Sequence, residues 1–243
     1  DKAVIVLQAG AGFGKTSLLA QWRKEALQAG AVVAWLMLDG RDTDNRLVAG
    51  LTAAMRVGSG RPNFGQACLG AAGLDSSSLE GITQWLAEVA DLAADTVLIL
   101  DDVHTMPEAP LQQSLAYLLL NAPSNLRIIL ASRKPIALPV SDLPSRGHFV
   151  ELAVADLRFQ LAETVALLQK RFGRRIDMDS CVRLHELTEG WPLGLQLAVA
   201  TIERSTDLQQ AIAGLSVRSG DLHRYFVESL VDHLPPESAR FLV

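Results

Sequence analysis

The sequence is poor in several features that mark large classes of protein. It has two cysteines, Cys68 and Cys181, which lie far apart and lack the spacing of metal ligands, so we expect reduced thiols in a cytoplasmic protein. No apolar run approaches the length that spans a bilayer, and no signal peptide opens the chain. These absences argue against a zinc site and against a membrane partner.

Basic residues are not in excess either. The chain has 22 Lys and Arg against 27 Asp and Glu, which gives a formal net charge of −5 at pH 7. A protein that neutralises nucleic-acid phosphates needs a basic face. The charge therefore argues against this segment being the part of a protein that binds DNA or RNA.

Several familiar catalytic and cofactor patterns are also missing. There is no Ser-His-Asp arrangement and no dinucleotide fingerprint, because Gly10, Gly12 and Gly14 lie too close together. No guanine-specific Asn-Lys-x-Asp pattern occurs, and there is no fixed-period repeat. The 243 residues are 49% hydrophobic and 20% charged, which suits one large α/β domain plus a smaller helical one.

The most informative segment that is present lies near the start of the chain. An apolar run over residues 3–8 leads into a glycine-rich turn, and Lys15-Thr16 then opens a helix in which apolar residues recur at helical spacing. Such a loop lets backbone N–H groups converge on an anion, and the helix N-terminus adds positive potential. The residues predicted to hold a nucleotide are Ala9, Gly10, Ala11, Gly12, Phe13, Gly14, Lys15, Thr16 and Ser17.

Two side chains of this loop have specific predicted roles. Lys15 would reach the outer phosphates, and the Thr16 hydroxyl would bind Mg²⁺. Ala9 departs from the strict pattern, which has glycine there. That glycine eases the exit from the strand, so we expect the change to be tolerated.

Apolar runs and helical patterns alternate along the first part of the chain. They predict strands at residues 3–8, 32–38, 97–102, 126–131 and 149–152, and helices at 44–57, 79–93 and 111–120, with Asp44 as a cap and a loop over 58–78. The run at 32–38 is expected to be covered on both faces. This alternation predicts right-handed βαβ units and a parallel sheet, with sites at the carboxyl ends of the strands.

Strand patterns stop near residue 155. The remainder suits helices at 161–172, 180–188, 193–203, 208–215 and 222–234. We therefore predict a nucleotide-binding domain over residues 1–155 and a helical subdomain over 156–220.

A pair of carboxylates follows the third apolar run. A carboxylate at the end of a buried strand beside a phosphate loop can hold Mg²⁺, often through water, and Asp101 fits that role. Asp102 is then the candidate to orient or deprotonate an attacking water. Alternatively, the pair ends a strand and caps the next segment.

Arg133 ends the neighbouring predicted strand, where its guanidinium could approach the γ-phosphate. We count Lys15, Asp102 and Arg133 as the candidate catalytic residues. An exposed arginine at the start of a loop is the alternative. His104, just past the carboxylates, is more often a turn or packing residue than a catalytic one.

The ordered motifs at residues 9–17, 34–39, 99–104 and 130–133 resemble the nucleotide-binding module of MalT-like regulators. These are LuxR-type transcriptional activators within the STAND class of signal-transduction ATPases. Segments around 156–163 and 188–198 resemble the helical subdomain of that class. Residues 221–243 resemble the beginning of its winged-helix subdomain.

The resemblance implies a switch that is inactive with ADP and self-associates with ATP. An inducer would bind a C-terminal sensor region, and DNA a C-terminal helix-turn-helix, both outside this chain. Pro192 would lie near the base, although a proline in the first helical turn is favourable in itself. Hydrolysis is expected to be slow, because no residue can be assigned as an arginine finger in cis.

Two other interpretations stay open. The chain could be an AAA-like P-loop ATPase with a remodelling or loading role, or a non-catalytic interaction domain with a decayed loop. Residues 1–2 lead at once into an apolar run, and residues 238–243 stop inside an apolar pattern. We therefore expect a piece of a longer protein.

Overall fold

The computed structural model describes residues 4–66, 68, 78–136, 149–205 and 207–217. Contacts between residues divide the chain into two compact units. The first comprises Asp1–Ala11 and Lys15–Asp156, and the second comprises Gly12–Gly14 and Leu157–Val243.

The first unit is built on a five-stranded sheet with the order β2-β3-β4-β1-β5. Its strands are β1 (Val4–Gln8), β2 (Val32–Met37), β3 (Thr96–Asp101), β4 (Leu126–Ser132) and β5 (Phe149–Leu152). All four pairings between neighbouring strands are parallel. This sheet confirms the predicted α/β class and brings the carboxyl ends of the strands to one edge.

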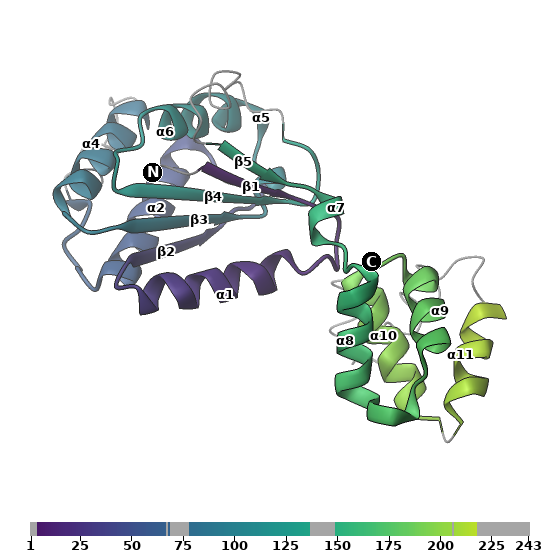
Figure 1. Ribbon diagram of the computed structural model, residues 1–243. Helices are drawn as coiled ribbons and strands as arrows, with labels where there is room; N and C mark the ends of the chain where they lie inside the picture. The colour runs from purple at the N-terminus through teal and green to yellow at the C-terminus, as the bar shows by residue number, and fades with distance from the viewer. Residues whose placement is uncertain (1–3, 67, 69–77, 137–148, 206, 218–243) are drawn as a thin grey trace. The chain divides into compact units, whose positions relative to one another are not determined.

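Helices cover both faces of this sheet (Figure 1). The chain moves across the sheet in one direction from β1 to β2 and in the other from β2 to β4, so right-handed crossovers place α1 (Lys15–Gln28) on the opposite face from the later helices. The other face carries α2 (Asp44–Ser59), α4 (Ser78–Asp91) and α6 (Ala116–Leu120). The result is a layer of strands between two layers of helices.

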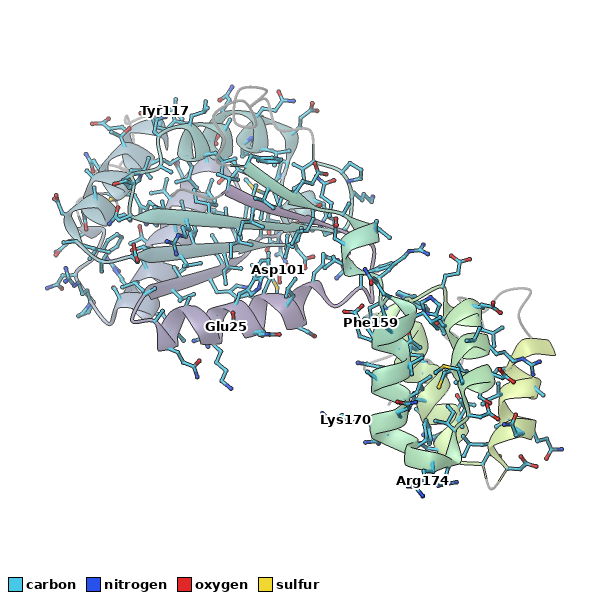
Figure 2. The ribbon with its side chains drawn as sticks, in the orientation of Figure 1. Glu25, Asp101, Tyr117, Phe159, Lys170 and Arg174 are labelled. Carbon is cyan, nitrogen blue, oxygen red and sulfur yellow. The ribbon has the colours of Figure 1, made fainter. Side chains whose placement is uncertain are left out.

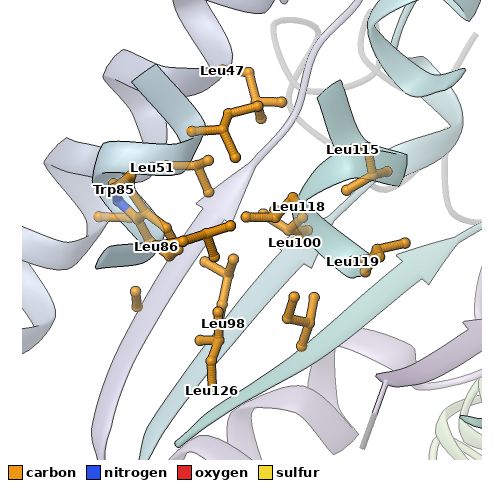
Figure 3. Close-up of a cluster of buried hydrophobic side chains, with 14 of the residues drawn as sticks. Leu47, Leu51, Trp85, Leu86, Leu98, Leu100, Leu115, Leu118, Leu119 and Leu126 are labelled. Atoms are coloured by element: carbon orange, nitrogen blue, oxygen red, sulfur yellow. The ribbon is translucent and has the colours of Figure 1, made fainter. Parts of the chain in front are cut away.

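The larger core lies between the sheet and α2, α4 and α6 (Figure 3). Leu98 and Leu100 of β3 point into it, while the alternate residues Val97 and Ile99 belong to the smaller core under α1. Every residue of β3 is buried, because both of its faces are covered. A continuous apolar run is the sequence pattern of such a strand.

Strand β2 is correctly predicted as covered on both faces, since Ala34 and Trp35 pack into opposite cores. It is nevertheless the edge strand of the sheet. Met37, its last residue, is 64% exposed. The apolar run alone did not indicate this edge position.

Several helix boundaries differ from the prediction. Thr43, not Asp44, is the N-cap of α2, and the Asp44 carboxylate accepts a hydrogen bond from the buried Ser114 hydroxyl. The helix predicted at 111–120 begins earlier, as α5 (Glu108–Pro110), and continues through a π-helical turn (Leu111–Leu115) before α6. In the predicted loop at 58–78, α2 extends to Ser59 and residues 66 and 68 are helical, while most of the rest lies outside the described residues.

The described helices of the second unit are α8 (Leu161–Phe172), α9 (Met178–Thr188), α10 (Pro192–Glu203) and α11 (Leu208–Val217), which follow the short α7 (Val154–Leu157). Helix α9 packs against each of the other three. Their shared core contains Leu168, Leu184, Leu195, Ile202 and Ile212. The predicted helix at 222–234 and the predicted winged-helix start at 221–243 lie outside the described residues.

Local signals fix where these helices begin. Gln160 and Glu163 form a capping box at α8, and the Asp177 carboxylate accepts the Ser180 N–H at 2.8 Å at the start of α9. Pro192 is the first residue of α10, where its lack of an N–H costs no hydrogen bond. Among the described helices, none is long and apolar enough to cross a membrane.

Candidate functional site

The glycine-rich loop begins where β1 ends. The Ala9 N–H donates to the Ser132 carbonyl at 3.2 Å, which continues the pairing of β1 with β4 by one residue. Ala9 is not among the residues with positive φ, so glycine is not required at this position. Gly12 and Gly14 both have a φ of 78°, a conformation that side chains disfavour.

Lys15 is the first residue of α1, and its side chain folds back over the loop. It is 8% exposed, and its Nζ donates to the carbonyls of Ala9 at 2.6 Å and Gly10 at 2.9 Å. Burial, followed by the nearby Arg133 charge, lowers the pKa of Lys15. The loop therefore holds a partly desolvated cation, the arrangement that a phosphate group would stabilise.

Asp101 is the last residue of β3 and is 3% exposed (Figure 2). Its Oδ1 accepts the Asp102 N–H at 2.9 Å. Burial raises the pKa of this carboxyl above its ordinary value. A buried carboxylate is stabilised by a cation, so Asp101 fits the predicted role of holding Mg²⁺.

No cluster of three or more His, Cys, Asp or Glu side chains suited to a metal occurs among the described residues. Magnesium in phosphate-transfer sites usually keeps several waters and takes one or two protein ligands together with substrate phosphates. The acidic Asp101 and the hydroxyl of Thr16 at the start of α1 suit this mode of binding.

Asp102 turns the chain sharply after β3. Its φ and ψ are 56° and 37°, the left-handed region that Asp tolerates better than most residues. The Asp102 carbonyl accepts the Thr105 N–H at 2.9 Å and the Thr105 hydroxyl at 2.8 Å. These bonds hold the turn that separates the side chains of Asp101 and Asp102.

The Asp102 carboxylate lies beside the end of β4. Its Oδ1 is 3.5 Å from Nε of Arg133 and 3.8 Å from Nδ1 of His104. The Arg133 N–H donates to the same His104 nitrogen at 3.4 Å. The structure therefore brings together Asp102 and Arg133, the predicted catalytic residues that follow β3 and β4, and it adds His104 between them.

His104 is more involved than the sequence indicated. To accept the Arg133 N–H, Nδ1 must be unprotonated. Burial is the largest effect on this imidazole and lowers its pKa, although the Asp102 charge opposes the shift. Its position two residues after the carboxylate was the one available signal.

Sequence patterns did not identify Thr105 as a residue that shapes the site. Its one hydroxyl hydrogen is shared between the Asp102 carbonyl and the Leu38 carbonyl, which lies 3.0 Å from the hydroxyl oxygen just beyond the end of β2. It thus ties the turn after β3 to the neighbouring strand. Nothing in the sequence distinguishes this threonine from an ordinary turn residue.

The loop residues Gly12–Gly14 group with the second unit. The Leu193 N–H donates to the Gly12 carbonyl at 3.1 Å, and a Cβ on Gly12 would lie 2.7 Å from Cβ of Leu193 and 2.8 Å from Nε1 of Trp191. Pro192, between these two residues, is buried at the start of α10. A side chain at position 12 is therefore excluded by sterics as well as by its backbone conformation.

A hollow of about 250 Å³ lies beside the first residues of the loop. Gln8, Ala9 and Gly10 line it together with residues 133–135 and 153–155. Backbone groups of the loop thus remain accessible beside Arg133 and Lys134, both exposed cations.

Relatives of known name match the whole chain. It is 31% identical over 247 residues to the serine/threonine-protein kinase PknK of Mycobacterium tuberculosis, covering 100% of this chain and 22% of that protein. It is 29% identical over 244 residues to the HTH-type transcriptional regulator MalT of Vibrio campbellii. This alignment covers 99% of this chain and 26% of that protein. The chain thus spans about a quarter of the length of these relatives. No protein-family model matches it.

Among solved structures, the ORC1 protein of Aeropyrum pernix, determined in complex with DNA, is similar with a TM-score of 0.50 and 18% identity, over 97% of this chain and 63% of that one. At this identity the similarity concerns the fold alone. Together, the glycine-rich loop with Lys15, the parallel sheet and the similarity to MalT over the whole chain identify it as a MalT-like P-loop NTPase module.

Proposed function

We propose that this module is an ATP- and ADP-binding switch with slow ATP hydrolysis, part of a signal-responsive transcriptional activator. The observation that carries the proposal is the gathering of Lys15, Asp101, Asp102 and Arg133 at one edge of the sheet, each with a charge that acts on another of the group. Nucleotide phosphates and a divalent cation match this set of charges.

In the proposed complex, amides of residues 9–16 bind the phosphate oxygens. Lys15 exchanges its bonds to the Ala9 and Gly10 carbonyls for the outer phosphates. Asp101 and the Thr16 hydroxyl hold Mg²⁺, which when bound offsets the phosphate charge. Pro192 is proposed to lie near the adenine, as the resemblance implies.

Asp102 is proposed to orient the attacking water and to accept its proton as the water oxygen bonds to the γ-phosphorus and ADP leaves. Its carboxylate is only a quarter exposed, and the left-handed turn fixes its position. Arg133 is proposed to contact the γ-phosphate when ATP is bound, so that its position reports whether that phosphate is present.

The pair of Arg133 and Asp102 supplies a physical difference between ATP and ADP. The Arg133 side chain is 56% exposed, and ion pairs this exposed contribute only about 0.2–1 kcal/mol. Charge-assisted bonds to phosphate are stronger, so a γ-phosphate can draw Arg133 away from Asp102. ADP lacks that phosphate and would leave the pair intact.

Other parts of the proposal concern regions outside this chain. MalT is a transcriptional regulator by its name, and the chain matches only 26% of its length. An inducer-binding sensor, a DNA-binding domain and self-association in the ATP state are therefore proposed for the longer protein. A cytoplasmic location is proposed with them.

Isothermal titration of the 243-residue protein with ATP and ADP, with and without Mg²⁺, tests the proposal. We expect both nucleotides to bind, and Mg²⁺ to strengthen that binding. Asp101→Asn should reduce the effect of Mg²⁺. Turnover of ATP should be slow. Absence of heat for every purine nucleotide, in protein shown to be folded, would overturn it.

A second candidate is an AAA-like ATPase with a remodelling or loading role, which the fold similarity to the ORC1 protein favours. The two differ in kinetics. A remodelling ATPase that works as a ring would show hydrolysis that rises steeply with protein concentration and reaches ordinary enzyme rates. The switch would remain slow in the absence of its inducer.

A further inference from the structure

Helix α10 is apolar on more than the face that it buries. Leu195, Ala198 and Ile202 point into the core of the second unit. A second stripe, spaced at i, i+3, i+4 and i+7, consists of Gln196, Val199, Ala200 and Glu203, of which the middle two are apolar. A helix that is apolar nearly all round is normally covered on all sides, yet Ala200 is exposed and Val199 is half-buried.

Helix α8 presents a matching stripe. Leu167, Lys170 and Arg171, at i, i+3 and i+4, line the same groove as the second stripe of α10, and its volume is about 440 Å³. Leu167 and Val199 both pack on the core of the unit, so they form the floor of the groove. Two parallel stripes of this spacing form the surface against which a further helix packs.

Two cations line the groove, and three more lie close to lining residues in the sequence. Lys170 and Arg171 are followed by Arg174 and Arg175 in the turn after α8, and Arg204 caps α10, all exposed (Figure 2 labels Lys170 and Arg174). Cations are favourable at helix C-termini, which explains part of this charge but not the apolar stripe beside it.

The acidic residue that lines the groove is already paired. Nη2 of Arg171 lies 3.1 Å from Oε2 of Glu203, and a second contact joins Nε to Oε1. This hydrogen bonding lowers the pKa of Glu203 and raises that of Arg171. Of the charged residues that line the groove, this leaves Lys170, whose charge is positive.

We infer that the groove between α8 and α10 is a docking site for an acidic amphipathic helix of a separate partner protein. The apolar stripe of that helix would lie on Leu167, Val199 and Ala200, and its carboxylates would meet Lys170 and the arginines. A second copy that bound through this same face would bring the same cations to the groove, which like charge disfavours. Nucleic acid would gain nothing from the apolar floor. The inference does not depend on nucleotide binding.

Fluorescence anisotropy with the 243-residue protein tests the site. The probe is a synthetic helical peptide of about 18 residues, or five turns, with leucines at i, i+3, i+4 and i+7 and glutamates on either side. The control peptide has lysines in place of the glutamates. We expect the glutamate peptide to bind at least tenfold more tightly.

Two variants locate the binding. Lys170→Glu and Ala200→Asp, both at exposed positions, should each weaken binding of the glutamate peptide at least tenfold. Lys24→Glu, on the exposed side of α1, should leave it unchanged. Circular dichroism would confirm that each variant is folded.

Several results would overturn the inference. These are no binding of the glutamate peptide, equal binding of both peptides, and displacement of the peptide by duplex DNA. Self-association of the protein that Lys170→Glu abolishes would assign the groove to a second copy instead. Nucleotide affinity, measured on the same samples, tests the proposed function separately.

Discussion

Lys15 is the side chain that we expect to contribute most to nucleotide affinity. Replacing it with Ala removes its contacts to phosphate, and hydrogen bonds to charged groups contribute about 1.5–3 kcal/mol. We therefore expect affinity for ATP and ADP to fall by a factor of about 10 to 100. Isothermal titration measures this, and Lys24→Ala, on the exposed side of the same helix, is the control. Unchanged affinity in Lys15→Ala would indicate a loop that no longer binds nucleotide.

Asp102→Asn separates binding from chemistry. Asn tolerates the left-handed conformation as well as Asp does, so the turn should be preserved. Loss of a general base typically slows a reaction by about 10² to 10⁴-fold. We expect ATP affinity to be retained while single-turnover hydrolysis falls. A loss of affinity as large as that of Lys15→Ala would refute this division of roles.

Because His104 titrates differently in the folded and unfolded chain, we expect the free energy of unfolding to depend on pH. Its pKa in the folded protein lies below the ordinary value of 6.5, so the unfolded chain binds more protons between the two values. The contribution of His104 to the free energy of unfolding is then fully present above about pH 6.5, and it is lost as the pH falls below that value. We expect His104→Gln, which can still accept the Arg133 N–H, to lose less stability than the wild type between pH 7 and pH 5.5. Urea unfolding at both pH values measures the difference, and equal losses would contradict the assignment.

At the scale of elements, the close packing of α2 on β2 depends on Gly58. A Cβ at this position would lie 2.2 Å from the Val33 carbonyl oxygen. Ala in a helix is otherwise favoured over Gly by about 0.5–1 kcal/mol. The clash should outweigh this gain, so we expect Gly58→Ala to destabilise the protein by about 1–3 kcal/mol in chemical unfolding.

The control for this substitution is Gly40→Ala. The nearest atom to a Cβ there is the Thr105 carbonyl oxygen at 3.6 Å, an ordinary contact. Its stability should change little. If both variants were equally stable, α2 would have to be able to move away from β2.

The same element shows what local patterns could and could not predict. The prediction of which α2 residues face the core is confirmed, since Leu47, Leu51, Ala54 and Met55 are all buried. The cap was wrong, because Thr43 precedes the helix while the Asp44 side chain bonds to Ser114. Ser114 is distant in sequence, so only the packing of helices on the sheet could reveal this bond.

At the scale of the whole molecule, the net charge of −5 predicts weak affinity for DNA. Binding to duplex DNA depends on neutralising phosphates and shows a steep dependence on salt. We expect the isolated chain to show no such binding near physiological salt in a gel-shift or anisotropy assay. Tight, salt-dependent binding would contradict the proposal that DNA is bound by another part of a longer protein.

Local sequence patterns were enough to predict the glycine-rich loop before Lys15, the parallel α/β fold, and the helical character of the described segments after residue 160. These depend on residues close together in the chain, namely the glycines before Lys15 and the periodicity of apolar side chains. The sequence did not predict that Asp102, His104 and Arg133 meet, that β2 lies at an edge of the sheet, or that α8 and α10 leave a groove; these features depend on the folded arrangement. The order of strands and the packing of helices arise from contacts between distant segments, and a local pattern does not specify which distant segments will meet.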